Sequence, residues 1–256
     1  MLKQDMIRAF RTKGFWVAII FLSGLFIHAI RANTNLDGSV STYEIISVAM
    51  ALSGFTPFAA IFPALGYSVV FCEEYHSGYL KMITSRMSWK RYGINRIIAV
   101  AVSGGVVIAL PIMMVCIIGY IFGTHGMPQN GLFAGTHIQY LIEHYGDIYL
   151  LTGKVILGFL FGAMWALAGL GFSVWFCNRY VSLIAPFILY EVMWILLYKI
   201  PVLNPIYMVR GDDLGSYFLS GVMEIMYILI SLVFIWTGLK LSLIHISEPT
   251  RRVVIS

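Results

Sequence analysis

Charged residues are scarce in this chain. Asp, Glu, Lys and Arg make up 11% of its 256 residues, and hydrophobic residues make up 59%, whereas about 25% of an ordinary soluble domain is charged. This composition argues against a soluble protein and favours a membrane protein. Strand-like alternation of apolar and polar residues is also lacking. The apolar stretches are therefore predicted to be helices, which satisfy their own backbone hydrogen bonds in lipid.

Short motifs of catalysis and metal binding are missing as well. The sequence has no glycine-rich GxxxxGK[ST] loop, so any nucleotide hydrolysis must be performed by another polypeptide. Its three cysteines show no CxxC spacing and are expected to form neither disulfides nor a metal site. His125, His137 and His144 follow no standard ligand spacing. We expect neither a bound metal nor a cofactor.

Long apolar runs make up much of the sequence. A helix needs about 20 apolar residues to cross the hydrocarbon core of a bilayer. Six runs are predicted as spans, the first and fifth being short for a full crossing: 15–30, 45–70, 97–122, 153–176, 181–198 and 221–240. We therefore predict an all-α, polytopic membrane protein with six transmembrane helices in a single domain, 1–240.

The positive charges are distributed unevenly between the two sides of these spans. With 241–256 left aside, the cations beside one set of alternate loops are Lys3, Arg8, Arg11, Lys13, Lys81, Arg86, Lys90, Arg91, Arg96, Arg179 and Lys240. Those beside the opposite set are Arg31, Lys154, Lys199 and Arg210. Lys and Arg concentrate on the cytoplasmic side, so both termini are predicted to be cytoplasmic. This placement explains the basic charge without nucleic acid.

The two ends of the chain differ in character. The N-terminal segment has Leu2, Met6 and Phe10 on one helical face, which predicts a short helix in the cytoplasmic interface before the first span. Near the other end, LSLIHISEPTR at 241–251 resembles the translation of a transposase-type sequencing adapter. We therefore expect 241–256 to be a non-native tail without function.

Several residues inside the predicted spans are unusual for a membrane helix. Prolines expected to kink their helices are Pro57, Pro63, Pro111 and Pro186. Glycines expected to allow close packing of the fourth span are Gly158, Gly162, Gly169 and Gly171. Glu191 lies near the middle of the fifth span, where an ionisable residue is a candidate for the translocation path or for a helix–helix hydrogen bond. Glu224 is expected nearer the outer surface, within reach of water.

The polar segment 71–96 separates the second and third spans. It begins with Glu73 and Glu74 and continues with several Lys and Arg, among them Arg86. Such a segment cannot lie in hydrocarbon and is predicted to emerge in the cytoplasm. We expect a helix over 72–82 that continues from the second span, with both glutamates facing solvent.

Two short patterns occur in this segment. Glu74, Gly78 and Lys81 form Glu-x-x-x-Gly-x-x-Lys, and Ser88 and Tyr92 form Ser-x-x-x-Tyr. Together with the six spans and the N-terminal helix, they make the chain resemble the membrane subunits of type-2 ABC exporters, including bacteriocin and lantibiotic immunity permeases.

The resemblance implies a permease subunit in a bacterial plasma membrane, coupled to a separate ATPase subunit. A second permease subunit, identical or homologous, would complete the translocation path, and a peptide or another amphiphile would be exported. The residues that the resemblance assigns to coupling are Glu73, Glu74, Gly78, Lys81 and Arg86. Gly78 would allow close approach of another backbone.

Two other functional classes stay open. A non-catalytic membrane anchor or assembly factor would share the topology but would have no ATPase partner. An intramembrane protease is disfavoured, although Glu73 and Glu74 begin like its EExxxR signature, because Gly78 occupies the arginine position. The FxxxH at 133–137 is also predicted to lie on the opposite side of the membrane. We therefore do not expect an enzyme.

Overall fold

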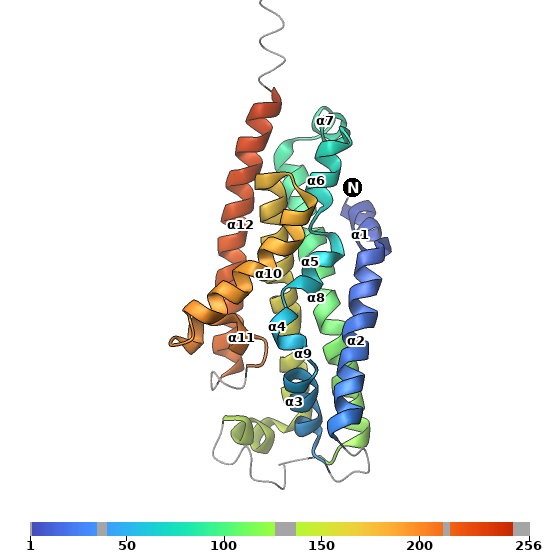
Figure 1. Cartoon of the computed structure of the whole chain (residues 1–256), viewed down its shortest axis with the longest axis vertical. Coiled ribbons are helices and arrows are strands. Elements are labelled where there is room, and N and C mark those ends of the chain that lie inside the picture. The colour runs from blue at the N-terminus through green and yellow to red at the C-terminus, as the bar shows by residue number, and fades with distance from the viewer. Residues whose placement is uncertain (1, 35–39, 126–136, 212–215, 248–256) are drawn as a thin grey trace, which may run out of the picture.

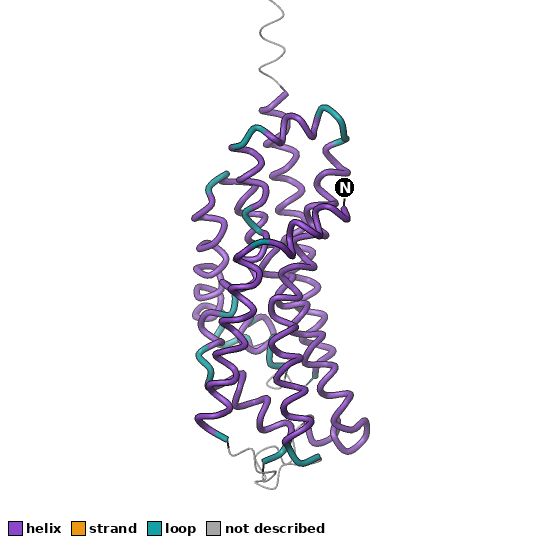
Figure 2. The backbone as a smooth tube through the Cα atoms, turned by 90° about the vertical axis from the view of Figure 1, so that its right-hand side faces the viewer, coloured by secondary structure: helices purple, strands orange, loops and turns teal. Residues whose placement is uncertain are grey.

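The computed structural model describes residues 2–34, 40–125, 137–211 and 216–247. These residues form an elongated bundle of helices (Figures 1 and 2). The only strand-like pairing within them is an isolated bridge between Ser41 and Thr124. The all-α fold predicted from the sequence is confirmed.

Five helices in the described ranges are long and apolar enough to cross a membrane. They are α2 (Lys13–Asn33), α8 (Trp89–Phe122), α9 (His137–Phe176), α10 (Arg179–Leu196) and α12 (Tyr217–Ser247). They correspond to all the predicted spans except the second, and they make the chain a polytopic membrane protein. α12 extends beyond residue 240 into the adapter-like segment, and 248–256 lie outside the described residues.

The second predicted span, 45–70, is not one helix. The chain forms four short helices in succession: α3 (Thr42–Leu52), α4 (Phe55–Phe58), α5 (Ile61–Tyr67) and α6 (Val70–His76). Gly54 has a φ of 73°, a left-handed conformation that ends α3. Pro57 and Pro63 lack the N–H that a continuous helix requires. By contrast, Pro111 and Pro186 lie inside α8 and α10 without ending them.

Neighbouring groups satisfy backbone oxygens that these breaks release. The Thr56 hydroxyl donates to the Met50 carbonyl at 3.1 Å, and the Tyr190 hydroxyl of α10 donates to the Thr56 carbonyl at 2.6 Å. A broken helix is tolerated at membrane depth when such partners are present. These short helices are therefore packed inside the bundle, where α5 lies against α2, α8 and α9, and Tyr190 bonds α4 to α10.

α9 is the central helix of the bundle. Of its most apolar stretch, 72% is buried, compared with 17% for α10 and for α12. A methyl group at Gly162 would collide with the backbone of Gly104 on α8, and one at Gly171 would collide with Phe234 on α12. Gly158 and Gly169 are similarly crowded. The predicted role of these glycines in close helix packing is confirmed.

Both termini of the described chain point to the same end of the bundle. Figure 1 shows α1 (Leu2–Arg11), α7 (Tyr79–Thr84) and the C-terminal end of α12 there, with α3 and the start of α9 at the opposite end. This arrangement agrees with the topology inferred from the positive charges. The short η1 (Pro201–Leu203) and α11 (Pro205–Met208) connect α10 to α12. We refer to the first end as the α7 end.

Candidate functional site

The segment 71–96 folds into most of α6, all of α7 and the first turns of α8. α6 ends at His76, and Gly78 then adopts a φ of 73° before α7 begins. Glycine adopts this left-handed conformation without the clash that a side chain would cause. The single helix expected over 72–82 is therefore wrong, because the chain turns at Gly78. A Cβ added at Gly78 would have no atom of the described chain within 4 Å. Glycine is therefore favoured here by the backbone conformation and not by close packing within the chain.

Glu74 lies inside the bundle, and the expectation that it faces solvent is wrong. The residue is 2% exposed. Its Oε2 accepts hydrogen bonds from the Tyr92 hydroxyl at 2.7 Å and from Arg96 Nε at 3.0 Å. Its Oε1 accepts a further bond from Arg96 Nη2. Tyr92 and Arg96 are four residues apart on α8, so both side chains reach the carboxylate from one helix face.

α1 completes a charge cluster around this carboxylate. Arg8 Nη1 donates to Glu74 Oε1 at 3.0 Å, and Arg96 forms a second ion pair with Asp5. Two carboxylates and two guanidinium groups give no net charge. Buried charges are tolerated when they are paired and hydrogen-bonded in this way. We call Asp5, Arg8, Glu74, Tyr92 and Arg96 the charge cluster; it joins α1, α6 and α8.

Three members of the charge cluster were not predicted as site residues: Asp5, Arg8 and Arg96. Arg96 carried a usable signal, because it is the last cation before the apolar run of α8 and a charge there requires a partner. Asp5 is the only acid in the basic segment before the first span. The sequence could not show that α1 packs against α8 and so brings these charges together.

The other predicted coupling residues lie on α6, on α7 and in the turn that follows α7. Glu73 and Arg86 are exposed. Glu73 lies 3.8 Å from Arg179, but their side chains are 53% and 65% exposed, so this ion pair is weak. Lys81 lies on α7, and its side chain is outside the described residues. Three large side chains are also exposed on these helices: Tyr75, Tyr79 and Met82.

α6 is attached to α9 as well. The Cys72 N–H of α6 donates to Ser173 Oγ of α9 at 3.1 Å. Burial raises the pKa of the Cys72 thiol, and Cys72, Cys116 and Cys177 are free thiols. α6 is thus bonded to α1, α8 and α9 through Cys72 and Glu74, whereas α7 lies at one end of the bundle (Figure 1).

Glu191 lies on α10, as predicted, and is partly exposed. Its Oε1 is buried and has no hydrogen-bond partner among the described residues. The neighbouring Val192 and Ile195 are exposed, so this face of α10 is open to lipid or to a second subunit. Glu191 stays a candidate for the translocation path.

Glu224 is deeply buried, and the expectation that water reaches it is wrong. Its side chain is fully inaccessible, and neither carboxyl oxygen has a hydrogen-bond partner within the described ranges. The residue follows Gly221 by one turn of α12, and Gly221 faces Leu157 and Leu160 of α9. Glu224 therefore lies near the α9–α12 contact, which the sequence alone did not locate.

The described histidines have few potential metal ligands near them. His125 Nδ1 lies 3.2 Å from Asp147, and its side chain is 57% exposed. His137 begins α9, but its side chain is outside the described residues. Nowhere in the described ranges do three His, Cys, Asp or Glu side chains come close enough to hold a metal ion.

Comparison with known proteins gives no family assignment. The chain matches no protein-family model, no curated protein and no solved structure.

Proposed function

We propose that the chain is the membrane-spanning permease subunit of an ABC-type exporter in a bacterial plasma membrane. It forms the translocation path with a second permease subunit, identical or homologous, and a separate ATPase subunit binds at α6 and α7. The proposal is supported by the five long helices with a segmented crossing, and by the Glu74, Gly78 and Lys81 pattern in 71–96. A peptide or another amphiphile is the proposed substrate.

The attachment of α6 to the bundle is the observation that carries this proposal. Glu74 in the last turn of α6 is paired with Arg8 of α1 and Arg96 of α8. Removing one partner of a buried ion pair costs roughly 3–5 kcal/mol, so α6 cannot easily move without α1 and α8. A partner that displaces α7 would therefore displace the helices that lead into the first and third crossings.

The exposed surface of α6 and α7 has the composition of a protein-binding surface. Tyr75, Tyr79 and Met82 are 43%, 40% and 60% exposed, and Glu73 and Arg86 are exposed on the same segment. Aromatic residues, Met and Arg are enriched in protein–protein interfaces. The chain itself has no phosphate-binding loop, so the ATP-driven step is assigned to the partner.

The test changes this surface and leaves the charge cluster intact. Met82→Asp combined with Arg86→Glu should prevent co-purification of an ATPase subunit that carries a GxxxxGK[ST] loop, with unchanged membrane insertion. Tyr145→Ala is the matched control, because Tyr145 is 57% exposed in the first turns of α9, at the opposite end. The proposal is wrong if no such subunit co-purifies with the unmodified chain, a result that favours an anchor or assembly factor.

A further inference from the structure

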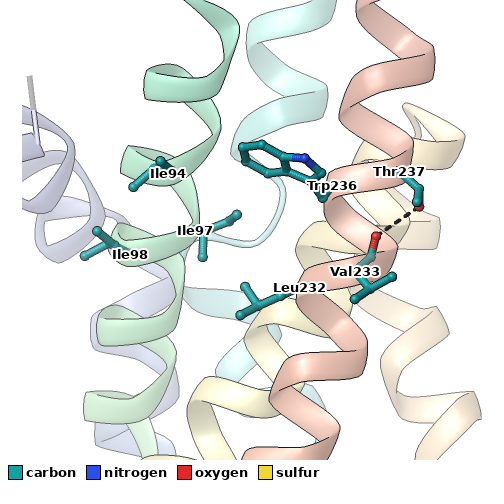
Figure 3. Close-up of a pocket in the computed structure, with 7 residues that line it drawn as sticks. All are labelled: Ile94, Ile97, Ile98, Leu232, Val233, Trp236 and Thr237. Atoms are coloured by element: carbon teal, nitrogen blue, oxygen red, sulfur yellow. Dashed lines mark hydrogen bonds between the residues drawn. The ribbon is translucent and has the colours of Figure 1, made fainter.

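An apolar groove runs between α8 and α12 near the α7 end (Figure 3). Its volume is about 450 Å³, and its lining consists of Ile94, Ile97, Ile98, Leu232, Val233, Trp236 and Thr237. The hydroxyl of Thr237 donates to the Val233 carbonyl of its own helix at 3.0 Å. The groove is therefore lined almost entirely by apolar atoms. Such a lining suits an acyl chain better than a polar ligand.

Two tryptophans mark the end of this groove that is nearer the α7 end. The rings of Trp89 on α8 and Trp236 on α12 lie with their centroids 5.0 Å apart. Tryptophan is enriched at the level of the lipid headgroups, where its ring contacts both hydrocarbon and polar groups. This pair therefore places the mouth of the groove at the membrane interface.

Three exposed cations lie close to the tryptophans in the sequence, and Lys90 and Arg91 directly follow Trp89 on α8. Lys90 and Arg91 precede Ile94 by about one turn of α8, and Lys240 follows Trp236 by one turn of α12. Neither α8 nor the part of α12 after Glu224 contains an acidic residue. The groove thus opens onto a patch of three positive charges on the side predicted to be cytoplasmic, where anionic lipids attract Lys and Arg.

We propose that this groove is a binding site for an anionic phospholipid. One acyl chain lies along Ile94, Ile98 and Val233, and the phosphate is held at the interface by Lys90, Arg91 and Lys240. The proposal requires that the chain lies in a bilayer, and it does not depend on an ATPase partner.

Among the described residues, a second apolar groove lacks the exposed neighbouring cations that the first one has. It has a volume of about 640 Å³ between α8 and α9, and its lining includes Ile117, Ile121, Ile148 and Ile156. The residue preceding Ile148 is Asp147, which pairs with His125. This groove is larger, but an acid rather than a set of cations stands beside it. It serves as an internal control for non-specific lipid contact.

Native mass spectrometry of the full chain, titrated with lipids of identical acyl chains, tests the proposal. Phosphatidylglycerol should bind more tightly than phosphatidylcholine. Lys90→Ala with Arg91→Ala should weaken phosphatidylglycerol roughly 25-fold, since about 1 kcal/mol per cation converts at 1.4 kcal/mol per factor of ten. Lys3→Ala with Arg11→Ala removes the same charge from exposed positions of α1 and should leave the affinity unchanged.

The hydrocarbon part of the site is tested separately. Ile94→Trp fills the α8–α12 groove and should weaken both lipids, whereas Ile117→Trp in the second groove should not. Equal binding of the two lipids, or equal losses in the two charge variants, would overturn the proposal. So would an Ile94→Trp variant that converts a dimer to a monomer without changing lipid adducts, because a second copy would then occupy the groove.

Discussion

Replacing Glu74 with Gln should destabilise the α7 end far more than replacing Glu73 with Gln. Glu74→Gln keeps the size of the side chain and an oxygen acceptor, but it removes the negative charge that faces Arg8 and Arg96. Only Asp5 then remains to balance two guanidinium groups. The cluster changes from no net charge to one excess positive charge, at a place where Arg96 is 2% exposed.

The expected loss follows from the burial of each partner. Removing one member of a buried pair costs roughly 3–5 kcal/mol. The side chain of Arg8 is 48% exposed and can be rehydrated, so the lower value, about 3 kcal/mol, applies to Glu74→Gln. Glu73 and Arg179 are 3.8 Å apart and more than half exposed. Glu73→Gln should therefore change stability by about 0.5 kcal/mol at most.

Equilibrium unfolding of the purified chain in mixed micelles, followed by tryptophan fluorescence, measures both changes. A double-mutant cycle of Glu74→Gln with Arg96→Gln isolates the pair, and we expect a coupling energy of about 2 kcal/mol or more. If Glu74→Gln and Glu73→Gln unfold alike, or if the cycle is additive, the buried cluster does not exist as described.

The same unfolding assay tests three glycines. Gly162→Ala should lower stability because its methyl group meets the backbone of Gly104, whereas Gly24→Ala, with no atom within 4 Å, should be neutral or stabilise by up to about 1 kcal/mol; the reverse order would contradict the packing of α9. Gly78→Ala should cost about 1–2 kcal/mol, and Gly78→Asn less, because asparagine tolerates the left-handed conformation better; an unaffected alanine variant would argue against the turn. If Glu191 lines the path, Glu191→Gln and Glu191→Leu should both alter export, and the glutamine variant should lose pH dependence near neutrality. Wild-type export by the glutamine variant, with weaker assembly of the leucine variant, would instead indicate a helix–helix hydrogen bond.

The long helices were predictable because the length of an apolar run is a local property. Lipid removes water as a hydrogen-bond partner, so a run such as 97–122 has few alternatives to a helix. The structure of the second predicted span was not predictable in the same way. In an isolated helix we would expect only kinks at Gly54, Pro57 and Pro63. The chain can break into short helices because Tyr190 donates a hydrogen bond to the Thr56 carbonyl, which the break leaves without a helical partner.

The candidate site was predicted as a segment, but not as a set of contacts. Glu73 and Arg86 are exposed, as expected for charged residues in a polar segment, and neither contacts a buried residue of opposite charge among those described. Glu74 is adjacent in sequence but points inward, because Arg96 and Tyr92 lie within reach on α8. Glu74 is buried and Glu73 is not because Tyr92 and Arg96, more than fifteen residues further along the chain, bind Glu74. The sequence around the two glutamates does not predict these contacts.

Site-specific photocrosslinking tests the central claim most directly. A photoreactive residue at position 82 on α7, compared with one at position 145 near the start of α9, should capture an ATPase subunit in native membranes only at position 82. Met82 is 60% and Tyr145 57% exposed, so accessibility does not distinguish them. An ATPase captured equally at both positions, or at neither, would contradict coupling through α6 and α7.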